Sequence, residues 1–127
     1  MFSKFFSKQC LSALFALATA CATSACTDTS QPSQTIVNYA QSAVPDDAQV
    51  AEVYQRSCMA CHSRGASDAP LTGHSAAWQP RLAQGMETLV NNVVSGKGGM
   101  PPYGLCMDCN ASEFQTLITF MATPAKP

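Results

Sequence analysis

The sequence predicts a small all-helical domain, and three observations support this fold class. Three segments after residue 45 repeat apolar residues at the three- and four-residue spacing of an amphipathic helix. No segment shows the alternation of polar and apolar residues that is typical of a strand. Stretches rich in Gly, Ser and Pro separate the helical segments. We therefore expect three to five helices with long loops, over a domain of residues 46–127.

The first 26 residues are interpreted as a secretion signal. Lys4 and Lys8 precede an apolar stretch over residues 11–18, and small residues follow it. The apolar stretch is shorter than the roughly 20 residues that span a bilayer, so removal of the segment is favoured over the alternative of an uncleaved anchor. Export to an oxidising compartment, the bacterial periplasm, is the expectation.

Two cysteines follow small residues in the manner of lipoprotein signals: Cys21 after Ala20, and Cys26 after Ala25. Neither has the usual leucine three positions earlier. Lipidation of Cys26 leaves two pairs of cysteines downstream, whereas lipidation of Cys21 leaves Cys26 as an odd thiol. Lipidation of Cys26, with membrane attachment, is slightly favoured over ordinary cleavage after Ala20 or Ala25, which gives a soluble product.

Residues 27–45 are rich in Ser, Thr and Gln and predict a flexible tether. A coil of this length ranges roughly 25 Å from its anchor. The alternative is that part of the tether packs back on the domain.

The first helix of the domain is predicted to begin at Asp46 or Asp47, which are suitable caps. One face of it carries apolar residues and ends with the first cysteine of the domain: Val50, Val53, Tyr54, Ser57 and Cys58. Residues 63–74 lack periodicity and predict a loop.

Three further helices are predicted. A short one covers residues 76–78, and Pro80 opens the next turn. The next has the clearest periodicity and ends at Gly96, with apolar positions Met86, Leu89, Val90, Val93 and Val94. The last begins at the capping pair Asn110 and Glu113, ends before Pro124, and carries the stripe Phe114, Leu117, Ile118 and Met121.

The run Cys58-Met59-Ala60-Cys61-His62 is the C-x-x-C-H pattern of covalent haem attachment. The two thiols can each add to one haem vinyl group, and the adjacent histidine can ligate the iron. A zinc or redox C-x-x-C is the alternative. The secretion signal favours covalent haem, because such attachment takes place outside the cytoplasm.

Met100 is the preferred second axial ligand, because it lies on the loop of residues 96–102, which is rich in Gly and Pro. Met59 lies between the two haem cysteines and cannot reach the far face of the haem. Other candidates lie on apolar stripes or in loops: Met86, Met107, Met121 and His74. Trp78 and Arg81 are candidates for holding a haem propionate, against the alternatives of a packing tryptophan and a solvated arginine.

Cys106 and Cys109 form a second C-x-x-C, but Asn110 stands where a haem-ligating histidine would be. A structural disulfide, a reactive dithiol and a zinc site shared with the first pair are the three alternatives. Asp108 opposes thiolate formation and no thioredoxin-like strand pattern surrounds the pair, so the disulfide is favoured. It would gain only about 2 kcal/mol in chain entropy, and its main effect would be to fix the loop that carries Met100.

Charge excludes one class of partner. Without Lys4 and Lys8 the chain holds five basic and eight acidic residues and no basic patch. Nucleic acid is therefore not expected as a partner, nor is an acceptor that needs a lysine-rich docking face.

From Val50 to Met121 the sequence resembles the class I cytochromes c, and specifically the small cytochrome c5-like group. The resemblance implies that Cys58 and Cys61 form the thioethers, that His62 and Met100 ligate iron, and that Cys106 pairs with Cys109. It also implies that the carbonyl of Pro70 accepts from the His62 ring, and that the first and last helices cross beside the haem, with Tyr54 near the apolar stripe of the last helix.

The expected function is that of a periplasmic one-electron carrier in a respiratory or related chain, not an enzyme, with no small-molecule substrate. Donor and acceptor proteins would dock transiently at an exposed haem edge formed by Met59, Ala60, Pro101, Pro102 and Tyr103. One alternative is a haem enzyme or gas sensor in which Met100 is displaced. A second is a fixed cytochrome subunit of a larger oxidoreductase.

Overall fold

The structure is a computed structural model that describes residues 31–126. The expected secretion signal, with Cys21 and Cys26, lies outside the described residues. Within residues 31–126 the chain forms six α-helices, two of which are joined by a π-helical turn, so that there are five continuous helices. These residues form no strand, apart from an isolated bridge between Lys97 and Met100. This agrees with the predicted all-helical class. No helix among the described residues is long and apolar enough to cross a membrane.

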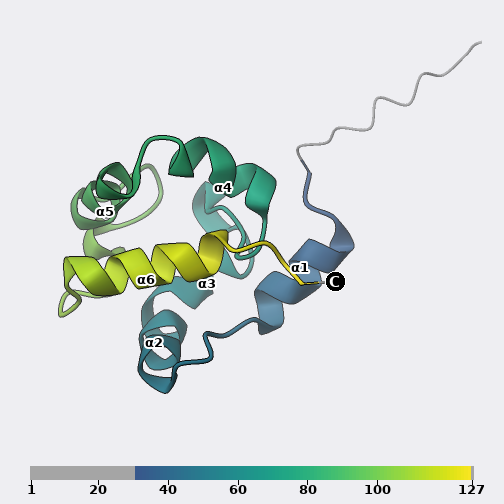
Figure 1. Ribbon diagram of the computed structural model, residues 1–127, viewed down its shortest axis with the longest axis horizontal. Helices are drawn as coiled ribbons and strands as arrows, with labels where there is room; N and C mark the ends of the chain where they lie inside the picture. Colours follow the sequence, from purple (N-terminus) through teal and green to yellow (C-terminus); the bar gives the residue numbers. More distant parts are fainter. Residues whose placement is uncertain (1–30, 127) are drawn as a thin grey trace, which may run out of the picture.

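Part of the expected tether is a helix, α1 (Gln34–Ser42), which lies beside the C-terminal end of the chain (Figure 1). The Ser33 side chain caps it, and Ala40 is fully buried. The Tyr39 ring lies over Gly73, where a Cβ atom would come within 2.6 Å of the ring. The segment packs back on the domain because apolar residues among its polar ones share one face of the helix.

The helix that leads into the C-x-x-C-H run is continuous but not uniform. It consists of α2 (Ala48–Val53), the π-helical turn η1 (Tyr54–Cys58) and α3 (Met59–His62). Asp47 caps α2 by accepting from two backbone N–H groups. A π-helical turn holds one extra residue, and such turns often occur at functional sites. This turn ends at Cys58, the first cysteine of the C-x-x-C-H run.

Two shorter helices follow the 3-10 turn η2 (Ala66–Asp68): α4 (Ser75–Leu82) and α5 (Met86–Ser95). The predicted short helix over residues 76–78 exists, but its predicted extent was wrong, because α4 continues through Pro80. The proline costs one backbone hydrogen bond, and both Pro80 and Ala76, four residues earlier, are exposed to water. Gly96 ends α5 with φ 80°, as predicted.

The last helix, α6 (Ala111–Ala122), begins with the predicted capping box of Asn110 and Glu113. It crosses the middle of the molecule, with α4 and α5 on one side and α2 on the other (Figure 1), and it contacts all three. Tyr54 meets Phe120 edge to face, with ring centroids 5.0 Å apart. The crossing of the first and last domain helices is therefore confirmed.

Candidate haem site

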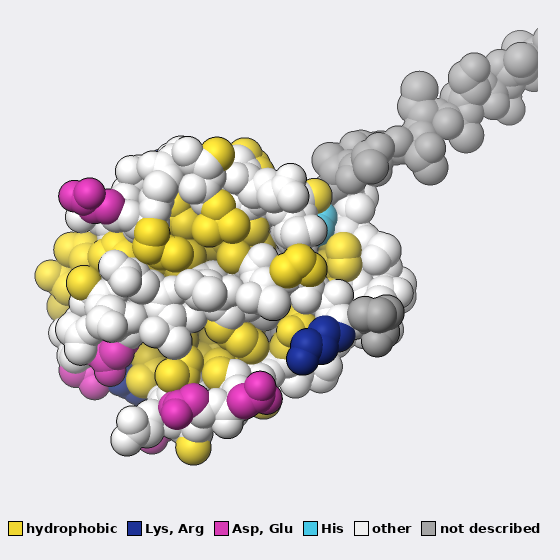
Figure 2. Space-filling model, viewed as in Figure 1, with side chains coloured by type: hydrophobic (Ala, Val, Ile, Leu, Met, Phe, Trp, Pro, Cys, Tyr) yellow, Lys and Arg dark blue, Asp and Glu magenta, His cyan; other side chains and the backbone are white. Residues whose placement is uncertain are grey.

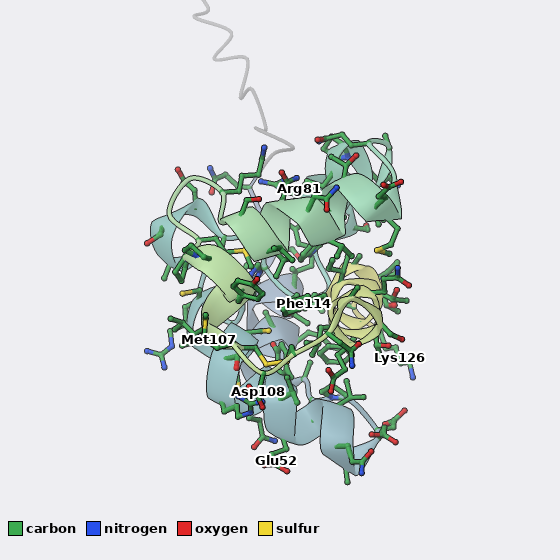
Figure 3. All side chains as sticks on the ribbon, turned by 90° about the vertical axis from the view of Figure 1, so that its left-hand side faces the viewer. Glu52, Arg81, Met107, Asp108, Phe114 and Lys126 are labelled. Atoms are coloured by element: carbon green, nitrogen blue, oxygen red, sulfur yellow. A yellow bond between two sulfur atoms is a disulfide. The ribbon has the colours of Figure 1, made fainter. Side chains whose placement is uncertain are left out.

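A cavity of about 340 Å³ lies between the C-x-x-C-H helix, α4, α5, α6 and the loop before η3 (Pro102–Leu105). Its walls are mainly apolar, and Phe114 points into the middle of the molecule from α6 (Figure 3). The volume falls within the range of cofactor and ligand pockets. All seven predicted haem-binding residues line it: Cys58, Cys61, His62, Pro70, Trp78, Arg81 and Met100.

Cys58 and Cys61 are free, partly buried thiols about one helical turn apart. Burial raises the pKa of Cys58 to about 11. It is therefore a neutral thiol at physiological pH. Both thiols face the same cavity as the His62 ring, which the C-x-x-C-H chemistry requires.

The His62 ring is held from two sides. Its Nδ1–H donates to the Pro70 carbonyl oxygen at 2.8 Å, as the family resemblance implied. Trp78 stacks beside the ring, with centroids 5.8 Å apart and an interplanar angle of 25°. Burial lowers the pKa of His62, so the ring is held neutral. Because a carbonyl only accepts, Nδ1 carries the proton and the Nε2 lone pair remains free for a metal.

Trp78 and Arg81 behave differently from each other. The Trp78 indole N–H donates to the Leu71 carbonyl at 2.9 Å. Of the two alternatives for Trp78, a propionate ligand and a packing tryptophan, the structure favours the second, because the N–H is used by the backbone and the ring packs against His62. Arg81 uses one guanidinium nitrogen on the Ala77 carbonyl at 2.5 Å, and its other donors remain for an anion. Lys97 is the second cation that lines the cavity, and sequence reasoning did not single it out.

Met100 lies in a tight turn in which it exchanges two backbone hydrogen bonds with Lys97, at 3.0 and 3.1 Å. Two glycines make room for this turn. A Cβ on Gly99 would overlap Ser67, and one on Gly104 would come within 3.0 Å of the Met100 methyl group. Of the other candidate axial ligands only Met121, on the buried stripe of α6, also lines the cavity.

The loop after Met100 is hydrogen-bonded to the C-x-x-C-H helix. Cys106 and Cys109 are joined by a disulfide, with Cα atoms 5.4 Å apart. Arg56, two residues before Cys58, donates to Cys106 Sγ at 3.3 Å and to Asp108 Oδ2 at 2.8 Å. Backbone and Arg56 hydrogen bonds lower the pKa of Asp108. Sequence reasoning missed Arg56, because no local spacing relates residues about 50 positions apart.

Three successive residues of this loop have left-handed backbone conformations: Tyr103 at φ 59°, Gly104 at 55° and Leu105 at 70°. For the two non-glycine residues this costs about 1–2 kcal/mol each. Such a conformation persists only where its surroundings hold it. The disulfide and Arg56 hold its C-terminal end.

We therefore expect replacement of both Cys106 and Cys109 by alanine to loosen the Met100 loop. Unfolding free energy should fall by about 2 kcal/mol. The iron ligation that we predict for Met100 should also weaken, so that carbon monoxide begins to bind the ferrous protein. Denaturant titration and carbon monoxide difference spectra measure the two effects. An unchanged potential together with unchanged methionine ligation would rule out this role.

The residues fit a haem. Two thiols, a neutral imidazole with a free Nε2 and a thioether surround one apolar cavity, with two cations on its lining. Ser57 Oγ is buried on this lining without a hydrogen-bond partner among the described residues. An unpartnered buried hydroxyl is costly and indicates a missing partner, such as a bound group or water.

Residues 45–121 match the family model described as "Cytochrome C oxidase, cbb3-type, subunit III". The cytochrome c5 of Azotobacter vinelandii is 38% identical over 73 residues, which are 56% of this chain and 88% of that protein. The chain belongs to the small class I c-type cytochromes. The predicted resemblance to this family is thus confirmed.

Solved structures give the same result for the fold of this cytochrome. A monohaem ferrocytochrome c from Shewanella putrefaciens is 39% identical, with a TM-score of 0.55, covering 65% of this chain and all of that one. A chain in the crystal structure of an electron-transfer complex of nitrite reductase with cytochrome c is 34% identical, with a TM-score of 0.54, covering 60% of this chain and 93% of that one. This cytochrome therefore carries one covalently attached haem c and is a haem-based electron carrier.

Proposed function

We propose that His62 and Met100 are the two axial ligands of the haem iron, and that this cytochrome is a one-electron carrier of a respiratory or related chain. The observation that carries the proposal is that a fixed imidazole and a thioether line one cavity beside the two haem cysteines. With both axial positions filled by the protein, no substrate can bind the iron. We therefore propose no catalytic reaction.

The bound haem supplies a reversible one-electron change between ferric and ferrous iron. Cys58 and Cys61 would each add an S–H across one vinyl group and fix the haem in the cavity. The Pro70 carbonyl and Trp78 hold the imidazole in one orientation. Phe114, Leu117 and the other apolar side chains exclude water from the buried face. A rigid, dry site of this kind keeps the same geometry in both oxidation states.

Arg81 and Lys97 are the cations on the cavity lining, and we propose that they pair with the haem propionates. Arg81 has guanidinium donors to spare, which suit a carboxylate. Lys97 pairs with Met100 through two backbone hydrogen bonds. A contact between Lys97 and a propionate would therefore also stabilise the turn that carries Met100.

The visible absorption spectrum of the matured protein tests the proposed ligation, ferric and ferrous, with and without carbon monoxide. We expect a low-spin spectrum with the weak red band of methionine on ferric haem, unaffected by carbon monoxide. A high-spin spectrum or ready carbon monoxide binding would show that Met100 does not hold the iron. The haem enzyme or gas sensor would then become the better interpretation.

Partners would dock transiently at the edge of the site. Pro101, Tyr103 and Leu105 line the cavity, and Leu105 remains 63% exposed. Met59 and Ala60, expected at the same edge, instead line a separate groove beside α1. Figure 2 shows an apolar band between α6 and the α4–α5 pair, with acidic side chains only at the edges of that face. A mainly apolar contact would make electron transfer only weakly dependent on salt.

A fixed subunit of a larger oxidase is the second candidate, because the matched family model is described as such a subunit. The relative in complex with nitrite reductase supports the mobile carrier. Size-exclusion chromatography of the protein extracted from its native membrane and soluble fractions separates the two. A carrier elutes alone, and a subunit elutes with its oxidase.

We further propose a periplasmic location with a lipid anchor on Cys26, supported by the sequence of residues 1–26. In cells labelled with a radioactive fatty acid, the wild type should be labelled and membrane-bound, and Cys26→Ala should be neither. Equal labelling of Cys26→Ala would contradict this site. Absence of label from the wild type would favour the soluble product.

A further inference from the structure

The four residues from Pro70 to Gly73 connect the site to most of the fold. Pro70 accepts from the His62 ring and Leu71 from the Trp78 indole. The backbone N–H of Thr72 donates to the His62 carbonyl at 2.9 Å, and that of Gly73 donates to the Met121 carbonyl at 2.8 Å. The position of the Pro70 carbonyl therefore depends on how this segment is held.

One contact of the segment is made by side chains alone. Tyr54 Oη and Thr72 Oγ1 share a hydrogen bond of 2.9 Å, and both residues are fully buried. Tyr54 is the first residue of the π-helical turn that ends at Cys58. Its ring is independently fixed by Phe120 of α6. The Tyr54 hydroxyl thus contacts the segment from Pro70 to Gly73 from a fixed position on the C-x-x-C-H helix.

The geometry points to Tyr54 as a positioning residue: we propose that its hydroxyl, through Thr72, fixes the Pro70 carbonyl against the Nδ1–H of His62 and thereby sets the donor strength of that ring. This inference rests on the proposed ligation of iron by His62. A hydrogen bond at Nδ1 raises the basicity of a ligating histidine. A more basic imidazole stabilises ferric iron relative to ferrous iron. The Tyr54–Thr72 pair would therefore lower the reduction potential, although neither side chain hydrogen-bonds to the imidazole ring.

The test removes the hydroxyl of each partner while keeping its shape, with Tyr54→Phe, Thr72→Val and the double variant. We expect each single variant to shift the equilibrium with a reference redox dye toward the ferrous protein by about threefold. The double variant should shift it no further than either single one, because all three lose the same bond. Exchange of the His62 Nδ1–H with solvent, followed by NMR in the ferrous protein, should become faster in all three.

Two controls separate positioning from general stability. Thr72→Ser keeps the hydroxyl and should retain the wild-type equilibrium. The Tyr39 ring packs against Gly73, next to Thr72, and its hydroxyl makes no hydrogen bond within residues 31–126. Tyr39→Phe should therefore leave the redox equilibrium and the exchange rate unchanged. Variants that are less stable but keep the wild-type potential and exchange rate would overturn the proposal, and so would an equal shift in Tyr39→Phe. A wild type that is not low-spin overturns the ligation itself, whereas unchanged variants in a low-spin background overturn only the positioning role.

Discussion

Replacement of Met100 by alanine is expected to open the sixth position of the iron and to lower the reduction potential by about 0.1 V or more. A thioether stabilises ferrous iron, so its loss favours the ferric state, and axial ligands are the strongest control on haem potential. The weak red band should disappear, and the ferrous form should bind carbon monoxide. Potentiometric titration and carbon monoxide difference spectra measure these effects.

The matched control is Met107→Ala. Met107 lies seven residues away in the same loop region and is 71% exposed, outside the cavity (Figure 3). Its replacement should leave the spectrum and the potential unchanged. A wild-type spectrum in Met100→Ala would show that another residue ligates the iron. Met121 would then be the first candidate, because it also lines the cavity.

The helices were predictable where one local pattern decides them. The stripe and capping box of α6 and the Gly96 end of α5 require only neighbours in the sequence. The extent of α4 and the existence of α1 depend on distant surfaces. Pro80 is tolerated because its turn of α4 faces water. The helix α1 is held on the domain by packing of the Tyr39 ring against Gly73. Periodicity identifies the apolar face of a helix. It does not identify the part of the fold that packs against this face.

The candidate site likewise combines features set by short sequence motifs with contacts between residues that are distant in the sequence. The attachment run and the Met100 loop are short motifs whose chemistry fixes their spacing, so sequence alone could indicate them. The Arg56 contact with the disulfide loop and the Tyr54–Thr72 bond join residues 50 and 18 positions apart. The Trp78 N–H was one candidate donor to a propionate, but it donates to the nearby Leu71 carbonyl. Competition between partners is decided by three-dimensional proximity, which a pattern does not contain.

Replacement of both Cys58 and Cys61 by alanine is expected to abolish covalent haem and, with it, the compact fold. An empty cavity of about 340 Å³ costs up to about 8 kcal/mol at the rate observed for cavities in protein cores. A domain of this size gains only about 3–5 kcal/mol from its core. The apoprotein should therefore lack a cooperative thermal transition in circular dichroism, and a denaturing gel stained for haem should show no band.

The Cys106→Ala, Cys109→Ala double variant is the matched control, because it removes the same number of cysteines from the same domain. It should keep the covalent haem band and a cooperative transition, at lower stability. The single variant Cys58→Ala should retain one thioether and give an intermediate band. A cooperative melt in the haem-free Cys58→Ala, Cys61→Ala variant would mean that the apolar side chains of α5 and α6 collapse into the cavity. The domain would then fold without the cofactor, and the haem would contribute less to the free energy of folding than the cavity volume implies.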